Sequence, residues 1–519
     1  MASDAQETTR SAGLRSFALL LGLALLLLAA ASWLEGSAAW RQPLRWLASL
    51  DSEAALSVLA GSAQIVAGVL AILITVVAIV VELAANRYTH RITQMFVRDR
   101  VTTAVMSLFV LTTVLCVWLA VALSGDVGEA PVMPRGGFLL AMGLMTACLL
   151  ILLPYFAYVF HFVSPHEVIR RIRVESLAEV RGAGGAREAK RAVIDAVEEL
   201  EDVARGAMQN SDRGIAMAAI EALTELLGDV ARQRRELPPD WFVLDDVIAR
   251  DADFVSMAAP ALQAIAQEGT WFEAKILRQC RELFVDACGN ARDVASMIAI
   301  HTRRLGEEFA LAHPPLLEQC QRAFNSYLRA SLNARDMRTG FYVLHQYRLL
   351  GESLLSQGLE PAVLEIASRI RFYGRTASAS ELPFLLEVAA YDLSNLIEAA
   401  AEKTAVRDAL LEVLLAIDHE GAENLLGVRK AQVQLATFFL ARGDVAPARR
   451  IASDLAGERR GLLLAAREEL ENELSPHYWE INDRAVNFSY LPPERRAKLG
   501  EVFSLIAQAT RGAAGRASS

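Results

Sequence analysis

Four long apolar stretches stand near the start of the chain, and the rest repeats apolar and charged positions at helical spacing. A helix needs about 20 predominantly apolar residues to cross the hydrocarbon core of a membrane. Residues 17–34, 57–82, 101–124 and 138–162 meet this requirement. The pattern predicts an all-α fold, in which a four-helix transmembrane region is followed by a large, solenoid-like helical domain in the cytosol.

These predicted elements divide the chain into four parts. A polar cytosolic arm covers residues 1–16, and the transmembrane region covers 17–163. An all-helical cytosolic domain covers 164–510. The final segment, 511–519, contains small and polar residues, and we expect it to be disordered.

The first apolar stretch has an alternative interpretation as a signal peptide. Arg10 and Arg15 precede it, and Ala29-Ala30-Ala31 near its end could form a cleavage site. Three further stretches follow the first, which favours a membrane span. Either interpretation leaves the topology of the later spans unchanged.

Basic residues near the ends of the spans predict their orientation. Ten arginines flank the side that carries the N-terminal arm, and three flank the opposite side. The ten are Arg10, Arg15, Arg87, Arg91, Arg98, Arg100, Arg170, Arg171, Arg173 and Arg181, and the three are Arg41, Arg45 and Arg135. Lys and Arg concentrate on the cytoplasmic side, so both termini of this multi-pass chain should be cytoplasmic. The arginine-rich, lysine-poor composition suggests a bacterial protein, and hence the inner (plasma) membrane.

One face of the second predicted span consists of small and polar residues at heptad spacing. We call these residues the small-polar stripe; they are Gly61, Gln64, Gly68, Ala71, Thr75, Ala78 and Glu82. Small residues allow close helix–helix packing in lipid, so the stripe predicts a packing seam. The alternative is the lining of a homo-oligomeric ion channel, with Glu82 forming a carboxylate ring at the inner mouth.

Helical spacing continues beyond Glu82, so the second span should extend into the cytoplasm as one long rod. The basic residues that follow are candidate contacts for phospholipid headgroups. They are Arg87, Arg91, Arg98 and Arg100.

The segments 60–64, 82–91 and 96–100 resemble an uncharacterised bacterial family of predicted membrane proteins, domain of unknown function 2254-like. Its members share a small-residue second span and an Arg-Asp pair before the third span, here Arg98-Asp99. The chain departs from the commoner pattern at Glu82, where Gln is usual, and at His90, where Pro is frequent. The resemblance covers about the first two-fifths of the chain, with a weaker echo at 202–208. It implies an architecture and no established activity.

A short repeat indicates helical hairpins in the cytosolic domain. Leu355-x-x-Gly358 followed by Ile366 recurs 85 residues later as Leu440-x-x-Gly443 followed by Ile451. The segment 434–444 around the second copy resembles one tetratricopeptide-like hairpin. Two copies predict hairpins stacked into an irregular solenoid.

The sequence contains little that points to chemistry. A formal net charge of -9 argues against nucleic acid as a partner, and the five cysteines form no CxxC pair. No HExxH, Walker, GxSxG or calcium-loop motif occurs, so we predict no catalytic residues, no metal and no cofactor. If residues 477–484 formed a helix, His477, Glu480 and Arg484 would share a face, which suggests a structural salt-bridge network. His345 and Arg348 invite the same interpretation.

These observations favour a membrane-tethered helical interaction or sensory module over an enzyme. The expected partners are the lipid bilayer, further copies of the chain and a cytosolic protein. The alternative is the ion channel lined by the second span. A membrane enzyme is the weakest hypothesis, because it would need the polar groups near the inner membrane surface to converge. Those groups are Glu82, His90, Asp99, His161, His166 and Glu167.

Overall fold

The computed structural model describes residues 52–87, 93, 96–97, 99–124, 135–182, 185–417, 426–479 and 484–517. Every regular element among these residues is a helix, and none is a strand, which agrees with the predicted all-α class. The predicted arm and the first predicted span, 1–16 and 17–34, lie outside the described residues. The described chain forms two compact units, Met1–Val168 and Ile169–Ser519.

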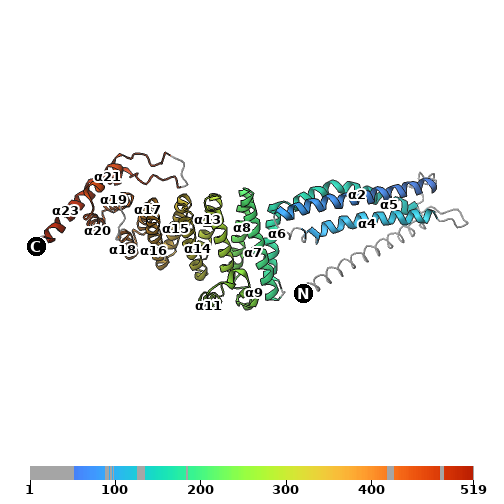
Figure 1. Cartoon of the computed structure of the whole chain (residues 1–519), viewed down its shortest axis with the longest axis horizontal. Helices are drawn as coiled ribbons and strands as arrows, with labels where there is room; N and C mark the ends of the chain where they lie inside the picture. The colour runs from blue at the N-terminus through green and yellow to red at the C-terminus, as the bar shows by residue number, and fades with distance from the viewer. Residues whose placement is uncertain are drawn as a thin grey trace. The chain divides into compact units, whose positions relative to one another are not determined.

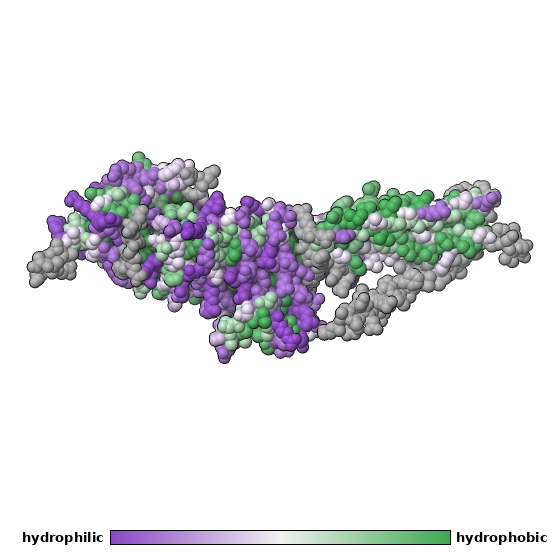
Figure 2. All heavy atoms as spheres, in the orientation of Figure 1, coloured by the Kyte–Doolittle hydropathy of each residue, from purple (hydrophilic) through white to green (hydrophobic). Residues whose placement is uncertain are grey.

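Three helices in the first unit are long and apolar enough to cross a membrane. They are α2 (Ser52–Arg87), α4 (Arg100–Ser124) and α5 (Arg135–Phe162). The second predicted span lies within α2, which is 36 residues long and continues past Glu82. Apolar colouring covers the surface of these helices in Figure 2, as expected for side chains that face lipid.

The three helices of the first unit pack against one another around a shared apolar core. Leu59 of α2, Leu115 of α4 and Ala141 of α5 are buried together in it. The contacts of Asp99 give a structural role to the acidic residue of the Arg98-Asp99 pair before α4. Its carboxylate accepts a hydrogen bond from the Thr102 backbone N–H at 2.9 Å, at the N-terminus of α4, and another from the Tyr158 hydroxyl of α5 at 2.8 Å.

The second unit is a long succession of helices, which carry mostly hydrophilic colouring in Figure 2. After α6 (Pro165–Arg181), the elements are α7 (Ala186–Gln209), α8 (Arg213–Arg232), η3 (Pro239–Phe242), α9 (Asp246–Ala249), α10 (Ala252–Val255), α11 (Ala259–Glu268), α12 (Trp271–Ala287), α13 (Arg292–Phe309), α14 (Pro314–Asn333), α15 (Met337–Ser356), α16 (Glu360–Ala379), α17 (Pro383–Ala399), α18 (Thr404–Leu415), α19 (Leu426–Ala441), α20 (Val445–Leu455), α21 (Arg460–Asn472), α22 (Pro493–Arg496) and α23 (Leu499–Ala517).

Alternate helices of this unit lie side by side and form two rows (Figure 1). In one row α8, α13, α15, α17 and α19 contact each other in that order. In the other row α7, α12, α14, α16, α18 and α20 do so. Each helix therefore packs on its neighbour in sequence and on the next helix of its own row.

Five hairpin turns between the rows share one backbone geometry. In each, a residue with positive φ follows a helix, and the next N–H donates to the carbonyl five residues earlier. The residues with positive φ are Ser211, Arg335, Gly358, Glu381 and Gly443. Gly358 and Gly443 are the two glycines of the sequence repeat, so that repeat marks two turns of one kind. The other three copies lack glycine and could not be recognised by it.

The C-terminal helix is longer than expected. α23 continues through Ala517 and covers most of the segment 511–519, for which the sequence analysis predicted disorder. Alanine has the highest intrinsic helix propensity, and the alanines of this segment extend the last turns of α23.

Candidate functional site

The small-polar stripe of α2 faces away from α4 and α5. Gln64, Gly68, Ala71, Thr75, Ala78 and Glu82 are exposed, and Gly61 is half-buried. A methyl group at Gly61 or Gly68 would meet no atom within 4 Å. The buried face of α2 lies elsewhere, at Leu59, Val66, Leu73, Val77 and Val81. Among the described helices, the stripe is therefore not the seam that joins α2 to its neighbours.

The candidate headgroup contacts are only partly described. Arg87 is the last residue of α2, and Arg100 is the first residue of α4 and is exposed. Arg91 and Arg98 lie outside the described residues, as does His90.

The condition for a face shared by His477 and Arg484, a helix through both, is not met by the described residues around them. α21 ends at Asn472, and residues 473–479 and 484–492 contain no helical turn. Pro476 disfavours helical geometry at Ser475, so α21 cannot readily continue through it. His477 is exposed whereas Arg484 is buried, so the two side chains do not share a face. Glu480 lies outside the described residues.

Arg484 instead inserts between α15 and α17. Its guanidinium donates to the two carboxylate oxygens of Asp392, at 2.7 and 3.0 Å, and to the backbone carbonyl of Phe341. Two parallel bonds to one carboxylate are the strongest geometry for this pair. The side chains of Arg484 and Asp392 are 2% and 0% exposed, respectively. The ion pair is therefore fully removed from water.

Arg348 and His345 of α15, both singled out from the sequence, belong to the same cluster. Arg348 donates to Asp392 at 3.2 Å and to the His345 Nδ1 at 3.1 Å, and it forms an ion pair with Glu352. Burial, together with the charge of Arg484, lowers the pKa of His345 to about 4, so this imidazole is neutral at pH 7. Burial raises the pKa of Glu352, and Arg348 opposes that shift.

The charges of this cluster are divided unequally between its parts. Helices α15 and α17 contribute two carboxyl groups, from Asp392 and Glu352, and only one guanidinium, from Arg348. A buried charge without a partner is costly, so these helices alone would carry a buried excess of negative charge. Arg484 supplies the missing positive charge.

An aromatic pocket lies beside the ion pair. The ring of Phe488 contacts Tyr391 at 4.2 Å, Phe341 at 6.0 Å and Phe384 at 6.4 Å between centroids. The Arg484 guanidinium stands 4.1 Å from the Phe341 ring centroid, which adds a cation–π contact. Arg484 and Phe488 are four residues apart. Their side chains thus occupy a charged site and an adjoining apolar site on α15 and α17.

Helix α19 holds the backbone of the same segment. The Gln434 side-chain amide donates to the carbonyls of Phe488 and Tyr490, at 2.9 and 3.3 Å. The Lys430 ammonium donates to the Ser489 hydroxyl at 3.0 Å. We call residues 484–491 the return segment. We call the surface of α15, α17 and α19 that contacts it the receiving face.

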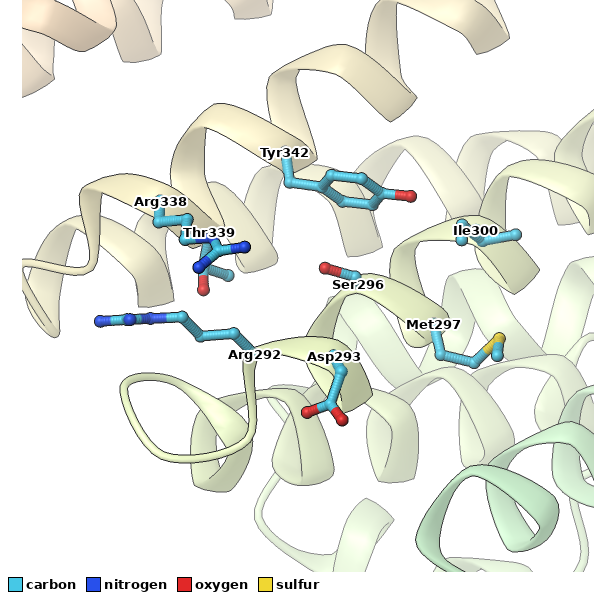
Figure 3. Close-up of a pocket in the computed structure, with 8 residues that line it drawn as sticks. All are labelled: Arg292, Asp293, Ser296, Met297, Ile300, Arg338, Thr339 and Tyr342. Carbon is cyan, nitrogen blue, oxygen red and sulfur yellow. The ribbon is translucent and has the colours of Figure 1, made fainter. Parts of the chain in front are cut away.

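Beyond the receiving face, α15 also packs against α13. A cavity of about 280 Å³ lies between these two helices, and Figure 3 shows the eight residues that line it. Arg338 and Tyr342 are among them, on the same face of α15 as His345. The cavity also presents the hydroxyls of Ser296 and Thr339. It therefore adds a mostly apolar recess with a few polar groups on the same face of α15 as His345.

Asp392 is the site residue that sequence reasoning missed. It shares α17 with Glu387 and Glu398, and no local pattern distinguishes it from them. Among the described residues, no group of three or more His, Cys, Asp or Glu could hold a metal ion. Burial raises the pKa of Cys280 to about 12 and of Cys288 to about 11, which disfavours their reactive thiolate forms.

Comparison with known proteins supports the resemblance found in the sequence. Residues 14–208 match the family described as "Predicted membrane protein (DUF2254)", which confirms that resemblance for this part of the chain. No curated protein matches the chain. Among solved structures the chain is similar to a "Circular tandem repeat protein with novel repeat topology and enhanced subunit contact surfaces", at 14% identity, covering 90% of this chain and 98% of that chain. The TM-score is 0.25, a value too low to support an argument about the fold.

Proposed function

We propose that this chain is a multi-pass protein of the bacterial plasma membrane whose helical unit binds other proteins in the cytosol. The proposed topology has four spans, with 17–34 as the first, and places both termini in the cytoplasm. The distribution of arginines around the apolar stretches supports this orientation. Labelling of a tag after Ser519 in intact cells tests it, since a tag reached from outside would contradict the topology.

The observation that carries the binding function is the occupied receiving face. This face already holds a non-helical segment of protein through an ion pair, an aromatic pocket and side-chain bonds to backbone carbonyls. Contacts of these kinds also occur where proteins recognise peptide segments. The two helix rows support a solenoid-like arrangement, in which repeated hairpins form a long continuous binding surface. The proposal includes no catalytic role and no nucleic-acid partner.

Site-specific photo-crosslinking in cells tests this function. A photoreactive residue at Tyr342, on the receiving-face side of the unit, should capture a defined set of cytosolic proteins. The matched control carries it at Phe372, which is exposed on α16 in the other row. Capture that is equal at both positions, or absent at Tyr342 in all growth conditions, would contradict the proposal.

The small-polar stripe supports a second candidate, a homo-oligomeric channel lined by α2. Its residues face away from α4 and α5, and all but Gly61 are exposed. They are therefore available to line an axis between copies of the chain. In liposomes, Gln64→Leu and Glu82→Gln should each change ion flux. Ile72→Leu, at an exposed position off the stripe, is the matched control. Unchanged flux in both stripe variants would eliminate this helix as a pore lining.

A further inference from the structure

The receiving face has the chemistry of a receptor for arginine. Asp392 offers both carboxylate oxygens to one guanidinium, the Phe341 carbonyl accepts a further bond, and the Phe341 ring supplies a π-face. A lysine ammonium cannot reproduce the paired bonds to the carboxylate. Because this cluster has one guanidinium on α15, that of Arg348, for the carboxyl groups of Glu352 and Asp392, an unoccupied face would leave part of their negative charge uncompensated.

The remaining contacts depend little on the identity of the bound segment. Gln434 binds two backbone carbonyls, which every peptide possesses. The aromatic pocket accepts one ring, four residues after the arginine. The face therefore specifies a non-helical segment with arginine at one position and an aromatic residue four positions later.

The loop that carries the return segment is tied at its base, and its described outgoing limb, residues 473–479, ends in exposed side chains. Arg496 donates to the backbone carbonyls of Glu473 and Leu491, which holds the two ends of the loop together. On the outgoing limb, Trp479 is 76% exposed and stacks on Tyr478. The part of this loop that the structure describes leaves α21 and returns toward α23 (Figure 1). The return segment could thus leave the face while Arg496 keeps the base closed.

We propose that the receiving face binds a cytosolic partner segment containing arginine and, four residues later, an aromatic side chain, and that the return segment is its built-in competitor. This inference rests on the proposed binding function and adds the partner's chemistry and its regulation. A tethered competitor acts at a high effective concentration, so a free partner segment binds only in proportion to the open fraction. The face is closed by default and opens to a partner that matches it.

The test uses the full chain in nanodiscs and a fluorescent peptide with the sequence of residues 484–491. The peptide should bind the double variant Arg484→Ala/Phe488→Ala at least about tenfold more tightly than the wild type, because the tethered competitor is weakened. Replacing the peptide's arginine with lysine, or adding Asp392→Asn to the variant, should abolish that binding. Arg369→Ala removes an exposed ion pair on α16 and serves as the matched control, with wild-type binding expected.

The outcomes separate this inference from the function on which it rests. Equal binding to wild type and double variant would show that the face accepts peptides but that the return segment does not compete. Binding to neither would make the return segment a permanent part of the fold. Both results overturn the inference, whereas the binding function is judged by the crosslinks at Tyr342.

A second measurement serves if the double variant does not fold. In the wild-type chain, backbone amides of residues 484–491 should exchange with solvent faster than those of α17, through local opening. The inference would be overturned if the backbone amides of residues 484–491 and of α17 exchanged only through one shared unfolding event.

Discussion

Arg484 and Asp392 form a buried, two-bond ion pair although 92 residues separate them in the chain. Asp392 lies on α17 within an apolar surrounding, and Arg484 lies on a segment without regular structure. The pair joins the return segment to α17, so its strength determines how firmly the return segment is held.

Removal of one member of this pair should cost more than removal of both. Arg484→Met leaves a buried carboxylate shared only with Arg348, and we expect a loss of about 3–5 kcal/mol in the free energy of unfolding. Arg484→Met with Asp392→Asn removes the unpaired charge and should cost less than the sum of the single changes. Urea unfolding of the full chain in detergent, followed by circular dichroism, measures these differences. Additive losses would contradict the cluster's charge balance.

Two Gly-to-Ala changes should alter the free energy of unfolding in opposite directions, because one glycine is tightly packed and the other is not. A methyl group at Gly374 would lie 2.6 Å from the Ala389 Cβ, so Gly374→Ala should destabilise the chain by about 1–3 kcal/mol through overpacking. Gly461→Ala on α21 meets no atom within 4 Å and should stabilise it by up to about 1 kcal/mol through helix propensity. Thermal unfolding of both variants tests the contrast, and stabilisation by Gly374→Ala would show that the two helices can separate freely.

The sequence predicted those features that depend on local composition. Long apolar stretches are recognisable as candidate spans because length and hydropathy are sufficient, and Gly358 and Gly443 marked two hairpin turns. The remaining turns of the same kind were missed, because Ser211, Arg335 and Glu381 adopt positive φ without the usual residue.

The candidate site was only partly predictable for a different reason. His345 and Arg348 lie on one face of a helix, so their proximity follows from sequence spacing. The contact of Arg484 with Asp392 depends on the path of the loop after α21, and no local pattern encodes it. A face shared by His477 and Arg484 required a helix through both, and the described residues 473–479 and 484–492 are not helical.

The turns with positive φ should respond to substitution according to their backbone. Gly443 has φ +79° and open space around a Cβ, so Gly443→Ala should lose about 1 kcal/mol from backbone strain alone. Ser211 has φ 59°, and Ser211→Gly should gain up to about 0.5 kcal/mol, since glycine removes the strain but has a larger unfolded-state entropy. Chemical denaturation compares the two variants with the wild type. A gain for Gly443→Ala would show that the turn relaxes to another conformation.

Acidification should weaken the helical unit through His345. The pKa of this imidazole is about 4 in the folded chain, because burial and Arg484 disfavour its charged form, and about 6.5 in an unfolded chain. Between these values the unfolded state binds more protons, so stability is complete above about pH 6.5 and falls as the pH drops toward 4. The difference sets an upper bound of about 3 kcal/mol on this loss.

His345→Gln keeps a hydrogen-bond acceptor for Arg348 without a titrating group, and it should flatten the pH dependence of unfolding. Burial also lowers the pKa of His301, so a smaller dependence of the same sign should remain in that variant. His477→Gln, at an exposed position, is the matched control and should leave the profile unchanged. An identical loss of stability in wild type and His345→Gln would place the acid-sensitive group outside the arginine–aspartate cluster.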